Sequence, residues 1–345
     1  MRKLVLLMVL LLITGCGAQS SQQRALGHAQ STATLGEEAQ TDDEPLQIVT
    51  TIFPIYDWTM EVLAEHGAQA QVSILMENGV DLHSFQPTAQ DIMTITMADL
   101  FIYVGGESDE WVEDLMKDPS VQNVTSLNLL EALGEAALKE EIVEGMEHDH
   151  DHEEEHDHEE EHDHEESELD EHVWLSLKNA QVLTKVIADT LSEMDAAHAA
   201  DYANAQSAYA KQLAALDASY EEAVHSAGRD TLLFGDRFPF RYLVNDYGLN
   251  YYAAFSGCSA ETEASFETVT FLANKADELD LSCVMTIDGS DLKIAQTIID
   301  NTKNKDCKLL TLDSMQSVKK SDVGNGITYL SVMEKNLNVL KEALQ

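Results

Sequence analysis

The chain has 345 residues, enough for two domains of ordinary size, and 44% of them are hydrophobic, which excludes an intrinsically disordered protein. Its 63 acidic residues outnumber 20 lysines and arginines, and the formal net charge of -43 excludes nucleic-acid binding, because phosphate recognition needs a positive face. Such a charge suits a protein that handles cations. Four cysteines are too few for a disulfide scaffold, and the sequence leaves open whether Cys283 and Cys307 pair.

The N-terminal residues have the pattern of an export signal. A basic start precedes an apolar run from Leu4 to Ile13, which is too short to remain as a membrane-spanning helix. The string that ends at Cys16, Leu-Ile-Thr-Gly-Cys, resembles a bacterial lipobox, in which the cysteine is lipidated; a plain signal peptide is the alternative. We therefore expect a signal peptide over residues 1–15, a flexible tether over 16–45 and an extracytoplasmic protein anchored by lipid to the bacterial cell membrane.

Predicted strands and helices alternate after the tether. A β-branched run from Gln47 to Phe53 is typical of a buried strand, and further strands are predicted at Ala70–Met76, Leu100–Gly105, Thr231–Gly235, Leu249–Phe255, Cys283–Asp288 and Lys308–Asp313. Amphipathic segments predict helices at Trp58–His66, Asp91–Met97, Ser265–Leu279 and Lys293–Asn301. The alternation predicts the α/β fold class, with two lobes that each contain a central, mostly parallel sheet flanked by helices.

A long helical stretch from Ser176 to Ser226 lies between the two halves. Apolar side chains recur on one of its faces, at Tyr202, Tyr209, Leu213, Leu216, Tyr220 and Val224. We expect a break near Met194–His198 and then a rigid helix at 196–228 that joins an N-terminal lobe at 46–195 to a C-terminal lobe at 229–345. A helix simply packed on one sheet is the alternative.

The segment 147–171 interleaves histidines with Asp and Glu and contains no Lys or Arg. Its histidines are His148, His150, His152, His156, His158, His162 and His164. A solvated acidic loop does not explain the histidines, and a pH sensor is a second possibility. Imidazoles and carboxylates together favour a third interpretation, a loop that collects metal ions. Because ordering such a loop costs entropy, we expect an accessory site that binds several ions weakly.

Two histidines lie in loops at the ends of predicted elements, where α/β proteins place their ligand sites. His83 follows the second predicted strand, and His172 leads into the long helical stretch. A single histidine in such a loop is more often structural or merely exposed. Two of them beside a metal-collecting loop favour a metal site on rigid elements.

The residues around these histidines resemble a known family. The segment His83–Thr88 with Asp91 resembles the His-aromatic-x-Pro-Thr-x-x-Asp motif of the cluster A-I metal-binding lipoproteins, the solute-binding components of zinc and manganese ABC importers. The segment His172–Ser176 is similar to their second ligand segment. The resemblance covers nearly the whole mature chain and implies an ion held between two lobes by His83, His172 and further ligands, with an ABC permease and its ATPase as partners.

The resemblance does not assign the remaining metal ligands to single residues as directly. The segment Thr311–Ser314 matches the one that supplies the last Asp, so Asp313 is expected, although an Asp that caps a helix is the alternative. The family's third ligand position falls on Arg237, which cannot bind a cation. We expect Asp236 to replace it if the loop shifts, or else to pair with Arg237.

A segment after the fifth predicted strand offers other donors. It resembles a family segment that carries an acid, and Glu261, Glu263 or Cys258 could complete the site instead. Buried thiols are commonly inert, which is the alternative for Cys258.

Histidines with carboxylates suit zinc, whereas manganese prefers more oxygen ligands, so the histidine-rich loop favours Zn²⁺ over Mn²⁺. The sequence lacks the Gly-x-Ser-x-Gly and phosphate-binding-loop motifs, which argues against an enzyme. We predict a receptor that captures zinc and delivers it to a permease. The alternatives are a manganese or iron receptor, a zinc hydrolase and a surface metal buffer.

Overall fold

The computed structural model describes residues 45–64, 70–146, 168–259, 263–303 and 305–345. The predicted signal peptide, Cys16, nearly all of the tether, and His148 to His164 of the acidic loop lie outside these residues. No helix in the described part of the chain has the length and apolar character needed to cross a membrane.

The N-terminal lobe contains a four-stranded parallel sheet in the order β2-β1-β3-β4. Its strands are β1 (Leu46–Thr50), β2 (Ala70–Ile74), β3 (Leu100–Tyr103) and β4 (Thr125–Asn128). The helices of this lobe are α1 (Phe53–Leu63), α2 (Ala89–Thr96), α3 (Glu110–Leu115) and α4 (Leu129–Leu133). Residues of α2 and α3 enclose a small core with one face of the sheet, at Val49, Ile95, Phe101 and Val112.

The C-terminal lobe repeats this arrangement with a second parallel sheet, in the order β6-β5-β7-β8. Its strands are β5 (Thr231–Phe238), β6 (Asn250–Ser256), β7 (Cys283–Ile287) and β8 (Lys308–Leu312), and its helices are α7 (Arg241–Tyr247), α8 (Phe266–Glu278) and α9 (Lys293–Asn301). Helices α8 and α9 pack on one face of the sheet. Two lobes with parallel sheets confirm the predicted fold class.

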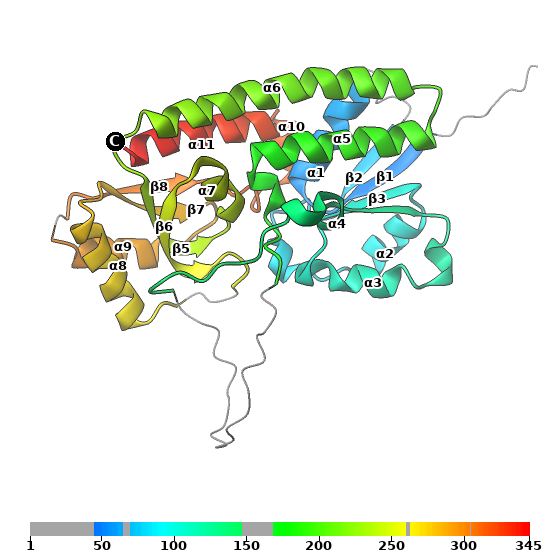
Figure 1. Cartoon of the computed structure of the whole chain (residues 1–345). Coiled ribbons are helices and arrows are strands. Elements are labelled where there is room, and N and C mark those ends of the chain that lie inside the picture. Colours follow the sequence, from blue (N-terminus) through cyan, green and yellow to red (C-terminus); the bar gives the residue numbers. More distant parts are fainter. Residues whose placement is uncertain (1–44, 65–69, 147–167, 260–262, 304) are drawn as a thin grey trace, which may run out of the picture. The chain divides into compact units, whose positions relative to one another are not determined.

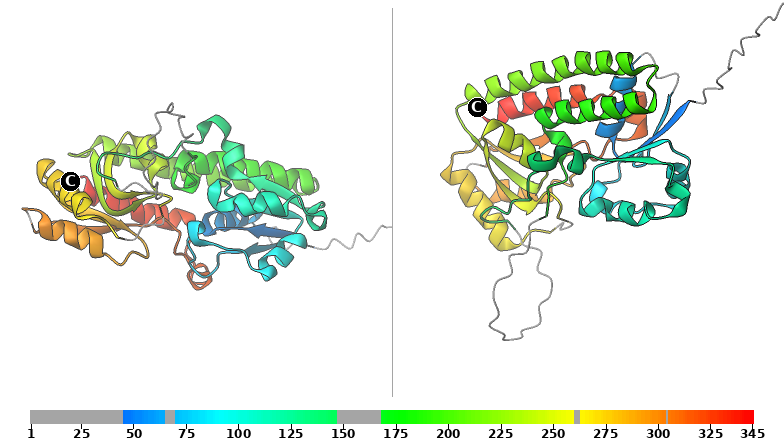
Figure 2. Two further views of the ribbon diagram at one scale, coloured as in Figure 1. Left: turned by 90° about the horizontal axis from the view of Figure 1, so that it is seen from below. Right: turned by 45° about the vertical axis from the view of Figure 1, so that its right-hand side comes forward.

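Long helices cover the other faces of the sheets. Helices α5 (Leu177–Met194), α6 (Ala199–His225) and α11 (Tyr329–Ala343) lie side by side (Figures 1 and 2) and share one continuous core with α1 and both sheets. The apolar face predicted for α6 is buried from Tyr202 to Tyr220, and the Tyr220 hydroxyl donates to the Met333 carbonyl at 2.6 Å. Helices α5 and α6 are separated where the sequence predicts a break, and the Asp195 carboxylate there accepts from His198 Nδ1 at 2.6 Å.

Some elements differ from the sequence predictions. Strand β1 ends at Thr50 instead of Phe53, because Phe53 already begins α1 and Pro54 suits a first helical turn. The last part of the chain, which includes α10 (Lys320–Gly324) and α11, contacts both lobes: the Tyr329 amide donates to the Asp57 carboxylate at 2.9 Å in α1. Cys283 and Cys307 are buried free thiols rather than a disulfide.

Candidate metal centre

The first histidine of the site is placed by a tight turn after β2. His83 lies in a short 3₁₀ helix, Leu82–Ser84, and its backbone amide donates to Asp81 Oδ1 at 3.0 Å. Downstream, Thr88 and Asp91 form a capping box that fixes the start of α2. The His-to-Asp motif found in the sequence therefore encodes the turn that presents His83, and Asp91 serves as a structural residue within it.

The second histidine lies just before α5 and is fully buried. Its backbone amide and its Nδ1 both contact Asp170 Oδ1, at 2.8 and 3.0 Å. Trp174, two residues later, donates its indole N–H to the Ser314 carbonyl at 2.9 Å, which ties this segment to the loop after β8. The residues before and after His172 in the chain therefore both fix its position.

The two imidazoles face each other through their Nε2 atoms, which are 3.1 Å apart. On His83, Nδ1 lies 2.8 Å from the Ser108 hydroxyl and 3.3 Å from Glu171 Oε2. A carboxylate beside Nδ1 favours a proton on that nitrogen in both rings, which leaves an electron pair on each Nε2. Two electron pairs at this distance repel each other unless a proton or a metal ion lies between them, so both Nε2 atoms are oriented to bind one cation.

The Glu171 carboxylate, which lies behind the His83 ring, is ionised. Burial by itself raises the pKa of Glu171, but hydrogen bonds with His83 and Ser108 outweigh burial and hold this pKa below its usual value. Glu171 also packs against Gly106, which has a φ of 84°, and a Cβ there would lie 2.5 Å from Glu171 Oε1. Only glycine fits that position, so the backbone itself is shaped around the carboxylate that orients His83.

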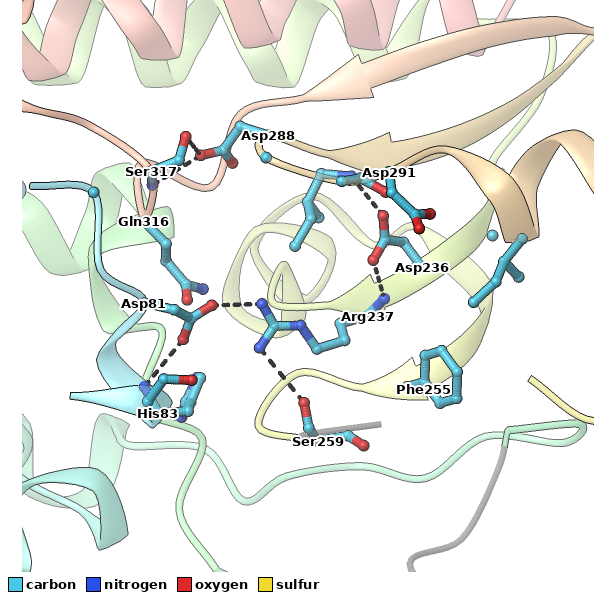
Figure 3. A pocket seen from close by; sticks show the side chains of 17 residues that line it. Asp81, His83, Asp236, Arg237, Phe255, Ser259, Asp288, Asp291, Gln316 and Ser317 are labelled. Carbon is cyan, nitrogen blue, oxygen red and sulfur yellow. Dashed lines mark hydrogen bonds and ion pairs between the residues drawn. The ribbon is translucent and has the colours of Figure 1, made fainter. Parts of the chain in front are cut away.

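A group of polar side chains next to His83, formed by Asp81, Arg237 and Gln316, connects the two lobes (Figure 3). Asp81 Oδ2 and Arg237 Nη2 form an ion pair at 2.5 Å. With its amide turned so that the NH₂ group donates to both Asp81 oxygens, at 2.9 and 2.8 Å, Gln316 brings its Oε1 to 3.1 Å from His172 Nε2. Burial raises the pKa of Asp81, but the hydrogen bond and charge of Arg237 reverse this effect and lower the pKa overall.

The two carboxylates expected to complete the site have other partners. Asp236 lines a cavity of about 480 Å³ beside His83, and its oxygens accept from the Arg237 and Ile287 amides at 2.9 and 3.4 Å. Asp313 accepts from the Met315 amide at 2.8 Å; burial and the nearby Asp288 charge raise its pKa to about 6. Arg237 pairs through its side chain with Asp81 and not with Asp236.

Among the described residues, the group of potential ligands that comes together is His83, His172 and Cys258, whose ligand atoms all lie within 4.8 Å of one another. Cys258 follows β6, and its backbone amide donates to Glu140 Oε1 at 3.0 Å. Burial, and then the charge of Asp170, raise the pKa of its thiol, so it keeps its proton until a cation binds. Glu263 is exposed, and Glu261 lies outside the described residues.

Several residues that shape the site were not found from the sequence. Asp170, Glu171, Ser108 and Gln316 contact the histidines or Asp81, yet only the acidic pair directly before His172 is a signal that the sequence could have offered. The others become neighbours only through the fold.

The comparisons with known proteins identify the family. A family model described as zinc-uptake complex component A, periplasmic (ZnuA), matches residues 48–343. The chain belongs to the ZnuA family. It is 30% identical over 304 residues to the zinc-binding lipoprotein AdcA of Streptococcus pneumoniae, covering 87% of this chain and 56% of AdcA. It is 27% identical over 334 residues to the high-affinity zinc uptake system protein ZnuA of Bacillus subtilis, covering 97% of this chain and 94% of that protein.

Solved structures of the ZnuA family agree with this assignment. The zinc-bound ZnuA-like domain of S. pneumoniae AdcA is 26% identical and superimposes with a TM-score of 0.66, covering 87% of this chain and 99% of that domain. The chain spans about half the length of the AdcA proteins that it matches, because it covers only 55–56% of them. The similarity therefore concerns the ZnuA-like part of AdcA.

Proposed function

We propose that this protein is a receptor that captures Zn²⁺ between its two lobes outside the cytoplasm and delivers the ion to an ABC-type permease and its ATPase. The observation that carries the proposal is the pair of imidazole Nε2 atoms 3.1 Å apart, each ring anchored at Nδ1 by a carboxylate. Neutral imidazoles are good zinc ligands, and carboxylates behind them raise their basicity. Membership in a zinc-uptake family agrees with this chemistry.

The receptor would act through a small closure of its lobes. The ion would bind His83 and His172 on the N-terminal lobe and a donor from the C-terminal lobe. The Asp81–Arg237 ion pair and the shared helical core would limit the amplitude of the movement. A closed surface that differs from the ion-free one would then mark the loaded form for the permease.

Two parts outside the described residues belong to the same proposal. Lipidation at Cys16 would hold the protein at the membrane surface, close to the permease. The histidines between 148 and 164 would collect ions for the site. The described segments that border them contact the C-terminal lobe, because the Cys258 amide donates to Glu140 Oε1 at 3.0 Å and the Glu140 amide donates to the Glu168 carbonyl at 2.8 Å.

Calorimetric titration of the chelator-stripped mature chain with Zn²⁺ and Mn²⁺ tests the proposal, alongside His83→Ala and a deletion of 147–169. We expect one tight zinc site that survives the deletion and is lost in His83→Ala. Tight manganese binding with weak zinc binding would instead support the manganese receptor. Loss of tight binding with the deletion alone would support a surface metal buffer, and hydrolysis of ester or peptide substrates would support a zinc hydrolase.

A further inference from the structure

We propose that Cys258 supplies a thiolate ligand, so that the ion is held by two imidazoles from the N-terminal lobe and one sulfur from the C-terminal lobe. This inference rests on the proposed function, because it assumes that the ion binds between His83 and His172. It replaces the carboxylates expected from the sequence with a different class of donor.

The distances among the three side chains fit such a site. Tetrahedral zinc has bonds of about 2.0–2.1 Å to nitrogen and about 2.3 Å to sulfur, which place two nitrogen ligands about 3.3 Å apart and nitrogen and sulfur about 3.6 Å apart. The two Nε2 atoms are 3.1 Å apart, and Sγ of Cys258 lies within 4.8 Å of both. A shift of the Cys258 side chain by about an ångström or less would complete the triangle.

The backbone around Cys258 is built to bring its sulfur to the histidines. A Cβ on Gly257 would lie 3.0 Å from His172 Cε1 and 2.9 Å from the Phe238 carbonyl oxygen, so the end of β6 packs directly on the imidazole ring. The Glu140 carboxylate holds the next amide, that of Cys258, at 3.0 Å. These two contacts hold the residue against His172 before any ion arrives.

Two other potential metal ligands expected on the C-terminal lobe already accept hydrogen bonds from the protein. Asp236 and Asp313 each accept from backbone amides of their own lobe, and Arg237 projects a guanidinium group that cannot bind a cation. The Gln316 amide oxygen, 3.1 Å from His172 Nε2, is a neutral neighbour that could take the fourth position. Among the described residues, Cys258 is therefore the C-terminal side chain that can add a negative charge to the ion after a shift of only about an ångström.

Binding would proceed without any redox change. The Sγ–H bond breaks, the proton passes to solvent, and the sulfur electron pair forms the bond to the ion. The buried carboxylates of Asp170 and Glu171, which contact the two imidazoles, balance the remaining positive charge. A thiolate favours zinc over manganese, because manganese prefers oxygen ligands.

Cobalt substitution tests the inference with a readout other than transport. Mature protein stripped of metal is loaded with Co²⁺, and its near-ultraviolet spectrum is compared with those of Cys258→Ser and of the matched control Cys307→Ser. Cys307 is a buried thiol whose sulfur donates to the Leu281 carbonyl at 3.4 Å, which a hydroxyl can also do. We expect a thiolate-to-cobalt charge-transfer band in the wild type and the control, and none in Cys258→Ser.

Competition with a chromophoric chelator then measures zinc affinity. We expect Cys258→Ser to bind at least about 100-fold more weakly, because loss of an outer-shell partner alone costs 10–100-fold. A wild-type cobalt spectrum without the charge-transfer band overturns the inference whether or not the variant folds. In that case, loss of zinc binding in His83→Ala would leave the proposed function standing, whereas unchanged binding in His83→Ala and His172→Ala would overturn the function itself.

Discussion

Asp81 in the N-terminal lobe and Arg237 in the C-terminal lobe form an ion pair, with 2.5 Å between Oδ2 and Nη2. The other Asp81 oxygen accepts the backbone amide of His83 at 3.0 Å. Both side chains are mostly buried, so solvent screens the pair less than it screens a surface pair. The positive charge of Arg237 on the C-terminal lobe therefore orients the Asp81 carboxylate. That carboxylate in turn holds the turn that presents His83 on the N-terminal lobe.

Replacing Arg237 with methionine is expected to weaken zinc binding about 10–100-fold, as loss of an outer-shell partner does, although Arg237 is not a ligand. Without its partner, Asp81 no longer holds the turn at His83. Calorimetry measures the effect, and Arg229→Met is the control, since Arg229 contacts Asp280 at the far end of the lobe. In a double-mutant cycle with Asp81→Asn, additive effects would contradict the coupling inferred from the ion pair.

Replacing Asp170 with asparagine is expected to weaken zinc binding by a similar factor, about 10–100-fold. The amide can still accept a hydrogen bond from His172 Nδ1, but it lacks the charge that raises the basicity of the ring. Asp189→Asn is the control, because Asp189 is exposed on α5 and forms an ion pair with Lys185. Zinc titrations of both variants that match the wild type would show that the Asp170 charge does not tune the site.

Replacing Asp313 with asparagine distinguishes between two possible ligand sets. The set expected from the sequence includes Asp313, whereas the set that the geometry favours is His83, His172 and Cys258. Asparagine retains the hydrogen bond to the Met315 amide, so the loop should keep its shape. We expect zinc affinity close to that of the wild type, because Asp313 is not part of the group formed by His83, His172 and Cys258. Loss of an outer-shell partner typically lowers metal affinity by about 10–100-fold. A decrease in zinc affinity of about 100-fold or more would therefore indicate that Asp313 is a ligand.

The fold was largely predictable because buried parallel strands and amphipathic helices leave long, regular patterns in the sequence. Strand β4 (Thr125–Asn128) was missed because three of its four residues are polar and none of the four is buried. His83 and His172 could be proposed as ligands from the sequence because each belongs to a local motif. The C-terminal donors were harder to assign, since the direction of a side chain at a strand end depends on tertiary contacts: Asp236 turns toward backbone amides, while Gly257 lets Cys258 approach His172.

Asp57 is expected to make the stability of the metal-free protein depend on pH. Burial raises the pKa of this carboxyl to about 7, although the Tyr329 amide acts in the opposite direction. The folded state therefore holds a proton that the unfolded state has released, and stability falls as pH rises from about 4 to about 7. The shift corresponds to roughly 4 kcal/mol at most.

Thermal unfolding of Asp57→Asn tests this expectation. Asparagine keeps an acceptor for Tyr329 but removes the buried charge, so the variant should unfold at a higher temperature than the wild type at pH 8. The difference should shrink as the pH approaches 4. Asp114→Asn, which changes an exposed residue of α3, serves as the control. Parallel pH profiles for Asp57→Asn and the wild type would contradict the assignment.

Replacing Gly257 with alanine is expected to weaken zinc binding and to lower stability together. The added Cβ would lie 2.9 Å from the Phe238 carbonyl oxygen and 3.0 Å from His172 Cε1, so either the ring or the end of β6 must move. Movement of either separates Cys258 from the histidines. Gly324→Ala is the matched control, because a Cβ there meets no atom within 4 Å. Calorimetry measures the zinc affinity, and thermal unfolding measures the stability. A Gly257→Ala variant that loses stability but binds zinc like the wild type would show that the contact between β6 and His172 does not position a ligand.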